Sequence, residues 1–247
     1  MNYSDSPKIE DGSDVKNTKP VPQENLFLNF ACNLIIPSFT FMKLSGEDYL
    51  GIKLAIITAL VFPLLYGIRD FIVRKNINFF SALGVISVLL TGGISLMELN
   101  AHYIAIKEAS IPSIFAIATL MSLKSSKPVI RIFVEFVFDI ELINESLRIN
   151  ESGTEFESLL VNGSWILAAG FLISAILNYS LATIILTAQP GTVAFNEQLG
   201  TMWALSFPVI ALPVTLILVA NLYYLLMGIR RITGLPLEDL LKNKTTT

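Results

Sequence analysis

Two stretches decide the fold: residues 164–188, SWILAAGFLISAILNYSLATIILTA, and residues 202–229, MWALSFPVIALPVTLILVANLYYLLMGI. Neither stretch contains Asp, Glu, Lys or Arg. About 20 apolar residues are enough for a helix to cross a hydrocarbon core of roughly 30 Å, whereas one charge at the centre costs about 2.5–3.5 kcal/mol. Both stretches are therefore predicted to be membrane-spanning helices.

The composition extends this prediction to the rest of the chain. Of 247 residues, 53% are apolar and only 15% are charged, which excludes an ordinary water-soluble enzyme of this size. The apolar stretches are continuous and do not alternate, so a strand barrel is excluded as well. The predicted fold is an all-α membrane protein with six transmembrane helices. The predicted spans cover residues 25–44, 49–72, 78–97, 103–123, 164–188 and 202–229.

The positive charges predict the orientation of these spans. Fourteen of the 17 Lys and Arg residues fall in the two terminal tails and in the loops after the second and fourth spans. The other three, Lys43, Lys53 and Lys107, fall on the opposite side. Because cytoplasmic loops are enriched in Lys and Arg, both termini are predicted to be cytoplasmic. Residues 1–24 are polar and are expected to form a disordered cytoplasmic tail, and residues 230–247 form the C-terminal tail.

The longest connection, residues 124–163, lies between the block of four spans (25–123) and the last two spans (164–229). Its first part, residues 128–148, is predicted to be one amphipathic helix. Its apolar side is formed by Val129, Phe133, Phe136, Ile140, Ile143 and Leu147. This side either lies on the inner surface of the membrane or docks on the bundle. Residues 150–163 are predicted to be a cytoplasmic loop.

The most notable ionisable residues are Lys107 and Glu108, which lie about one turn inside the outer end of the fourth span. Ionisable residues inside a membrane are functional candidates by default. The alternative is structural, because a lysine near the outer end of a helix can extend its side chain to the surface at small cost. The residues alone leave both interpretations open.

Several polar residues and prolines within the spans are further candidates. Asn33 and Asn178 can form hydrogen bonds between helices, and contact with a substrate is the alternative role. Asn196 and Glu197 lie in a predicted outer loop over residues 189–201, which is free of Lys and Arg. This loop could attract a cation, but the orientation of the spans alone also requires an outer loop without positive charge. Prolines kink helices, and such breaks often line cavities in transporters. The candidate kinks are Pro37, Pro112, Pro208 and Pro213.

Enzyme motifs are missing from the sequence. There is no Gly-x-Ser-x-Gly, no His-Glu-x-x-His and no Walker loop, so no catalytic residue and no cofactor are predicted. With one cysteine, Cys32, and one histidine, His102, a Cys/His metal site is not expected. A formal net charge of −3 gives no reason to expect a nucleic-acid partner.

Two groups of residues resemble the intracellular septation protein A family. The first is the string NFFSALGVISVLLTGGISLMELNAHYIAIKEASIPSIFA at residues 78–116, and the second is the Trp-led helix from Trp165 through Asn178 to the Phe195 and Gly200 signature. The ending RRITGLPLEDLL at residues 230–241 is similar to a bacterial multipass group distantly related to that family. The resemblance implies a bacterial inner-membrane protein without known catalysis, whose relatives are linked to envelope maintenance and division complexes.

Two functions are therefore expected as alternatives. The first is a non-enzymatic envelope protein that acts through helix contacts with other membrane proteins. Its expected partners are the lipid bilayer, envelope or division proteins, and a second copy of the chain. The second is a small secondary carrier whose path is lined by the kinked helices and the buried polar residues.

Overall fold

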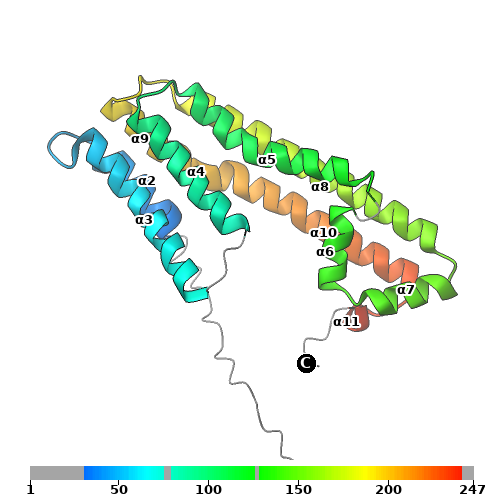
Figure 1. Ribbon diagram of the computed structural model, residues 1–247. Coiled ribbons are helices and arrows are strands. Elements are labelled where there is room, and N and C mark those ends of the chain that lie inside the picture. Colours follow the sequence, from blue (N-terminus) through cyan, green and yellow to red (C-terminus); the bar gives the residue numbers. More distant parts are fainter. Residues whose placement is uncertain (1–30, 75–78, 126–127, 241–247) are drawn as a thin grey trace, which may run out of the picture.

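The structure, a computed structural model, describes residues 31–74, 79–125 and 128–240 (Figure 1). Within these residues every regular element is helical. The predicted N-terminal tail, the first part of the first predicted span and the last seven residues lie outside this range. The elements are η1 (Ala31–Ile35), α2 (Ile36–Lys43), α3 (Gly51–Arg74), α4 (Phe79–Leu96), α5 (His102–Ser122), α6 (Val129–Val137), α7 (Ile140–Ile149), α8 (Gly153–Ile185), α9 (Val193–Ser206), η2 (Phe207–Ala211), α10 (Leu212–Thr233) and α11 (Leu237–Leu240).

Four helical segments are long and apolar enough to cross a membrane. They are Gly51–Arg69, His102–Ser122, Gly153–Ile185 and Val193–Thr233. These four correspond to the second, fourth, fifth and sixth predicted spans, so the prediction of an all-helical chain with several helices able to cross a membrane is confirmed. The first and third predicted spans are not among them, and the total of six spans stays a prediction.

Three long helices form the body of the molecule. Helices α5 and α8 run side by side, and α10 packs along α8 (Figure 1). Helices α2, α3, α4 and α9 gather at one end of this body, whereas the short helices α6, α7 and α11 lie at the other end (Figure 1). The body therefore connects two separately packed groups of helices.

Each end has its own hydrophobic core. At the first end, the buried side chains of Phe41, Ile104 and Leu199 belong to a cluster shared by α2, α5 and α9. At the second end, Val134 and Ile229 belong to a cluster shared by α6 and α10. Close van der Waals packing of these side chains holds both groups of helices together, and it is a main attraction between apolar helices inside a membrane.

Two glycines lie at close contacts between helices, where a side chain would collide with the neighbouring helix. A Cβ atom added to Gly92 of α4 would lie 2.3 Å from Leu60 Cδ1 of α3. A Cβ atom added to Gly200 of α9 would lie 2.7 Å from the carbonyl oxygen of Ser38 in α2. Small residues let helix backbones approach closely, as is common among membrane helices.

Residues 128–148 form two helices and not the single helix predicted. The break lies at Phe138 and Asp139, where the Asp139 side chain accepts hydrogen bonds from the backbone N–H groups of Glu141 and Leu142 and so caps α7. Asp is a strong N-cap residue because its side-chain oxygen satisfies helix N–H groups that have no partner in the helix. The spacing of apolar residues does not reveal such a cap, so it predicted one continuous helix.

The buried side of α6 also differs from the predicted one. Ile130 and Val134 are buried, whereas Phe133 and Phe136 of the predicted apolar side are exposed. In α7 the predicted Ile143 and Leu147 are buried as expected. Helix α6 packs on α8 and α5, and α7 packs on α10 and α8. Both helices therefore dock on the bundle, and in α6 the buried face differs from the predicted apolar face.

Two predicted loops are helical. Helix α8 begins at Gly153, so most of the predicted loop over residues 150–163 extends the fifth span by two to three turns. Helix α9 begins at Val193, within the predicted outer loop, and the Thr192 side chain caps it by accepting from the Phe195 backbone N–H. Charges and short polar residues in these segments favoured loops, yet one apolar face of each helix is buried against its neighbours.

Candidate functional site

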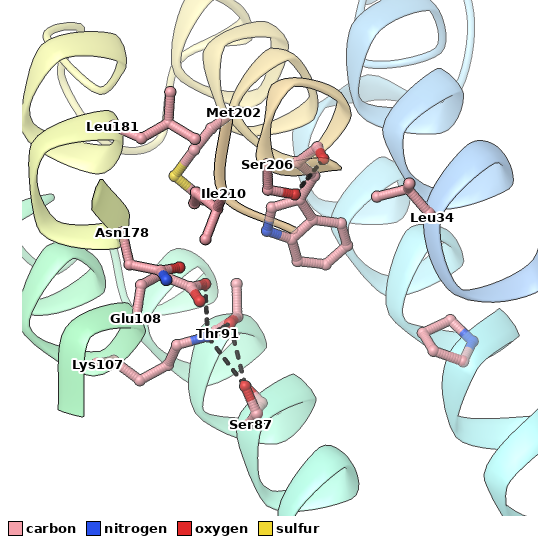
Figure 2. A pocket seen from close by; sticks show the side chains of 12 residues that line it. Leu34, Ser87, Thr91, Lys107, Glu108, Asn178, Leu181, Met202, Ser206 and Ile210 are labelled. Atoms are coloured by element: carbon pink, nitrogen blue, oxygen red, sulfur yellow. Dashed lines mark hydrogen bonds and ion pairs between the residues drawn. The ribbon is translucent and has the colours of Figure 1, made fainter. Parts of the chain in front are cut away.

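A cavity of about 230 Å³ lies where α3, α4, α5, α8 and α9 meet near the first end of the molecule (Figure 2). We call it the Lys107 pocket. Its polar side is formed by Ser87, Thr91, Lys107, Glu108, Asn178 and Ser206, and its apolar side by Leu34, Pro63, Leu181, Met202, Trp203 and Ile210. It therefore combines an apolar wall with a few converging polar groups, as ligand sites commonly do.

The Lys107 side chain is the centre of the polar side. Only 9% of it is exposed. Its Nζ atom donates to Thr91 Oγ1 at 2.8 Å, to Ser87 Oγ at 3.1 Å and to Glu108 Oε1 at 2.6 Å (Figure 2). An ammonium group has three N–H donors, so all of them are used within the protein. The side chain therefore points into the bundle and does not extend to the surface.

Glu108 is less enclosed than its partner. Its side chain is 23% exposed and lines the pocket, and one carboxylate oxygen pairs with Lys107. Asn178 of α8 also lines the pocket, and its Nδ2 group donates to the backbone oxygen and to the hydroxyl of Ser174 in the same helix. The tertiary structure thus brings three predicted candidates, Lys107, Glu108 and Asn178, into one site.

Two π-helical segments contribute side chains to the lining of this pocket. Leu34 belongs to the π-helical segment η1, and Ile210 belongs to the π-helical segment η2, whose Leu212 N–H donates to the Phe207 carbonyl. π-Helical turns inside α-helices are rare and often occur at functional sites. Proline causes part of this irregularity, because it has no N–H to donate to the residue four positions earlier.

The predicted kinks fall at these irregular segments and within α5. Pro208 lies in η2, Pro213 is the second residue of α10, which follows η2, and Pro37 is the second residue of α2, which follows η1. Pro112 lies inside α5, so it cannot donate to the carbonyl of Glu108, which is four residues earlier. Of the prolines in the spans, Pro63 of α3 lines the pocket directly.

The remaining predicted site residues lie elsewhere. Asn196 is fully buried, and its Nδ2 group donates to Ser45 Oγ and to the Ile52 carbonyl, each at 3.1 Å. It joins α9 to Ser45 in the turn between α2 and α3 and to Ile52 in the first turn of α3. This is a structural role, and it corrects the predicted place of Asn196 in an outer loop. Glu197 is exposed on α9. Asn33 lies in η1, and its side chain is outside the described residues.

The sequence did not predict the apolar wall of the pocket, nor the four lining residues with hydrogen-bonding side chains Ser87, Thr91, Trp203 and Ser206. Ser87 and Thr91 are four residues apart in the apolar helix α4, so they share one face. That spacing is a weak signal by itself, because hydroxyl groups in membrane helices often donate to their own backbone. Thr91 Oγ1 does so, at 3.0 Å from the Ser87 carbonyl, and Ser206 Oγ does so at 2.5 Å from the Trp203 carbonyl.

A second cavity, of about 630 Å³, lies between α5, α6, α8 and α10. Its lining is formed mainly by apolar side chains such as Phe115, Phe171 and Leu225, and it contains no ionisable residue. The smaller Lys107 pocket is therefore the better candidate for binding a polar or charged molecule, although it has about a third of the volume.

Metal binding and similarity to known proteins give no further indication of function. Among the described residues, no group of three or more His, Cys, Asp or Glu side chains could hold a metal ion. A comparison of the chain with known protein families, with curated proteins and with solved structures found no match. The geometry of the Lys107 pocket is therefore the main indication of function.

Proposed function

We propose that this chain is a small secondary carrier of ions or small solutes, and that the solute binds in the Lys107 pocket. The observation that carries the proposal is the Lys107–Glu108 ion pair, which lines a 230 Å³ cavity between helices that are apolar enough to span a membrane. Ionisable residues in such helices are rare and mark substrate or ion pathways. The two π-helical segments beside the cavity support the same proposal.

The cost of burying Lys107 favours a binding role over a purely structural one. A charged residue at the centre of a membrane helix costs about 2.5–3.5 kcal/mol. Lys107 lies nearer the outer end of its span than the centre, so its cost is lower than this value, and Ser87, Thr91 and the Glu108 ion pair offset part of what remains. Valine or leucine in place of Lys107, Ser87 and Thr91 would pack the same helices without the cost of burying a charge.

The proposed arrangement in the membrane has six spans over residues 25–44, 49–72, 78–97, 103–123, 164–188 and 202–229. Both termini are proposed to face the cytoplasm of a bacterium, across its inner membrane, because Lys and Arg concentrate on that side. In this orientation α5 begins at the outer face, and Lys107 lies five residues into it. At 1.5 Å per residue, the pocket lies roughly 7–8 Å below that face.

Cysteine labelling in membrane vesicles tests the proposal. In a Cys32→Ser background, Ser206→Cys places a thiol in the pocket, whereas Ile176→Cys places one on α8 at a side chain that is 58% exposed and does not line the cavity. A charged methanethiosulfonate reagent needs water to reach the thiol. We expect Ser206→Cys to react at least tenfold faster than Ile176→Cys.

The labelling result can also contradict the proposal. If neither Ser206→Cys nor Ser87→Cys reacts from either side of the membrane, the pocket is closed to water and the carrier proposal fails. A thiol at the exposed loop residue Thr187 serves as the positive control for reagent activity.

A second candidate function is the envelope protein that acts through contacts with other membrane proteins. It is favoured by an exposed apolar face on α6, where Ile132 and Phe136 lie one turn apart with exposed fractions of 55% and 76%. It predicts that cross-linking of the tagged chain in native membranes captures a defined set of envelope or division proteins, and that Phe136→Ser loses them. A solitary monomer or homodimer in both samples contradicts this candidate.

A further inference from the structure

The charged groups of the Lys107 pocket are not equally available to a ligand. The three donors of Lys107 are committed to Ser87, Thr91 and Glu108 at 2.6–3.1 Å. An anion would have to displace one of these partners before it could bind. The pocket therefore has no charged donor left for an anionic ligand.

Acceptors, in contrast, remain available on the same side. Glu108 uses one carboxylate oxygen for Lys107, and its second oxygen has no hydrogen-bond partner among the described residues. The Asn178 Nδ2 group donates to the carbonyl and to the hydroxyl of Ser174, so the side-chain carbonyl oxygen remains available to accept from a ligand. The Ser206 hydroxyl donates to the Trp203 carbonyl and can still accept.

The opposite wall adds the second element of recognition. Leu181, Met202 and Ile210 are apolar, and the Trp203 side chain lines the same cavity. Tryptophan is the best aromatic partner for a cation. The donors still available, the Ser87 hydroxyl and the Trp203 indole N–H, are neutral. A ligand that fits both walls thus has a positively charged donor group and a short apolar body.

The volume limits the size of this ligand. A cavity of about 150 Å³ in another protein binds benzene, which has six non-hydrogen atoms. The Lys107 pocket, at about 230 Å³, therefore accommodates a molecule with roughly six to nine non-hydrogen atoms.

We propose that the Lys107 pocket binds a small organic cation of the primary ammonium class, which donates to the second Glu108 oxygen and to the Asn178 carbonyl oxygen. Its apolar part lies against Met202 and Ile210. This inference rests on the proposed carrier function, since it names the class of solute for the same site. Lys107 then competes with the ligand for Glu108, because two positive charges share one carboxylate.

The two members of the ion pair are therefore expected to affect binding in opposite directions. The probe is n-pentylammonium, and the readout is protection of Ser206→Cys, in the Cys32→Ser background, from a small neutral methanethiosulfonate reagent. Saturating n-pentylammonium should slow labelling at least tenfold. Glu108→Gln should raise the half-protecting concentration more than tenfold, whereas Lys107→Gln should lower it.

Matched ligands and one further variant complete the test. Pentanoate has the opposite charge, and 1-pentanol has no charge, so neither should protect. Asn178→Leu leaves the ion pair intact, and it should raise the half-protecting concentration severalfold even if Glu108→Gln fails to fold. Ile176→Cys should show no protection by any of the three compounds.

Three results would overturn the inference. Protection by pentanoate that Lys107→Gln abolishes would make the site an anion site. Equal protection by potassium ions would make it a site for inorganic cations. If none of the compounds protects although Ser206→Cys still reacts, the proposed ligand class is wrong while the water-accessible pocket remains. Failure of the carrier proposal is different, because neither Ser206→Cys nor Ser87→Cys would then react with the charged methanethiosulfonate reagent.

Discussion

Gly200 provides a sensitive test of how closely α2 and α9 pack. An added Cβ atom would lie 2.7 Å from the Ser38 carbonyl oxygen, 2.8 Å from Phe41 Cβ and 2.8 Å from Met42 Cγ. Ordinary contact begins at 3.4 Å, so the closest approach is 0.7 Å too short. Two of these three atoms are fixed to the backbone of α2, and a rotamer change cannot move them. Gly200→Ala must therefore push the two helices apart.

The expected loss of stability follows from three contributions. Overpacking a well-packed site costs about 1–3 kcal/mol, and alanine in a helix is favoured over glycine by about 0.5–1 kcal/mol. Separation of the helices also weakens the edge-to-face contact of Phe41 with Trp203, whose centroids are 5.4 Å apart, and such a pair contributes about 0.5–1.5 kcal/mol. The net expectation for Gly200→Ala is a loss of about 1–2 kcal/mol.

Gly93→Ala is the matched control. Gly93 lies in helix α4, and an added Cβ atom there meets nothing within 4 Å. Only the helix preference applies, so this variant should gain about 0.5–1 kcal/mol. The same substitution is thus expected to change stability in opposite directions at two helical positions.

The assay is unfolding of the purified protein in mixed micelles by increasing amounts of denaturing detergent. In a Trp165→Phe background, fluorescence reports on Trp203 alone, which lies at the contact with Phe41. The midpoint should fall for Gly200→Ala and rise for Gly93→Ala. If Gly200→Ala is as stable as the parent protein, α2 and α9 do not pack as closely as the structure shows, and the reasoning is refuted.

Three further predictions concern residues that fix local geometry. Asn196→Asp replaces the donating Nδ2 group with a carboxylate that faces two acceptors, Ser45 Oγ and the Ile52 carbonyl. The unfolding midpoint of Asn196→Asp should therefore lie below that of Asn196→Leu. A higher midpoint for Asn196→Asp would contradict the role of Asn196 as a donor. Asp139→Ala removes the cap of α7 and should cost about 1 kcal/mol, seen as faster amide exchange in the first turn of that helix and not in α10. Gly191→Ala forces a side chain onto a residue with φ +80° and places Cβ 2.6 Å from the Glu98 carboxyl carbon. Its unfolding midpoint should fall, and Glu98→Ala should restore only the part due to that contact.

The spans and the Lys107–Glu108 candidate follow from sequence because they depend on local properties. A charge-free stretch such as residues 164–188 is apolar enough to cross a membrane in almost any context. An ionisable pair within such a stretch is recognisable from its place in the span. The composition and the length of the apolar stretches determined the all-helical fold class for the same reason.

The break at Asp139 and the helical state of residues 193–201 required the tertiary structure. The apolar spacing over residues 128–148 fits one helix, but a side-chain cap at Asp139 starts a second helix in another direction. Residues 193–201 carry the short and polar residues of a loop, yet Phe195 and Leu199 are buried in the core shared with α2. Packing against another helix overrides local preference at residues 193–201, whereas the break at Asp139 comes from a capping interaction to which the apolar spacing is blind.

The sequence by itself determined that the chain is a helical membrane protein and that Lys107 and Glu108 are unusual in it. Only the tertiary structure decided that Lys107 points inward, where Ser87 and Thr91 of another helix accept from it. Thr91 and Ser87 lie 16 and 20 positions before Lys107 in the sequence, and they meet its side chain because α4 packs beside α5. The direction of a long side chain depends on which acceptors the neighbouring helices bring within about 3 Å, and helix order in space is not encoded in the local sequence.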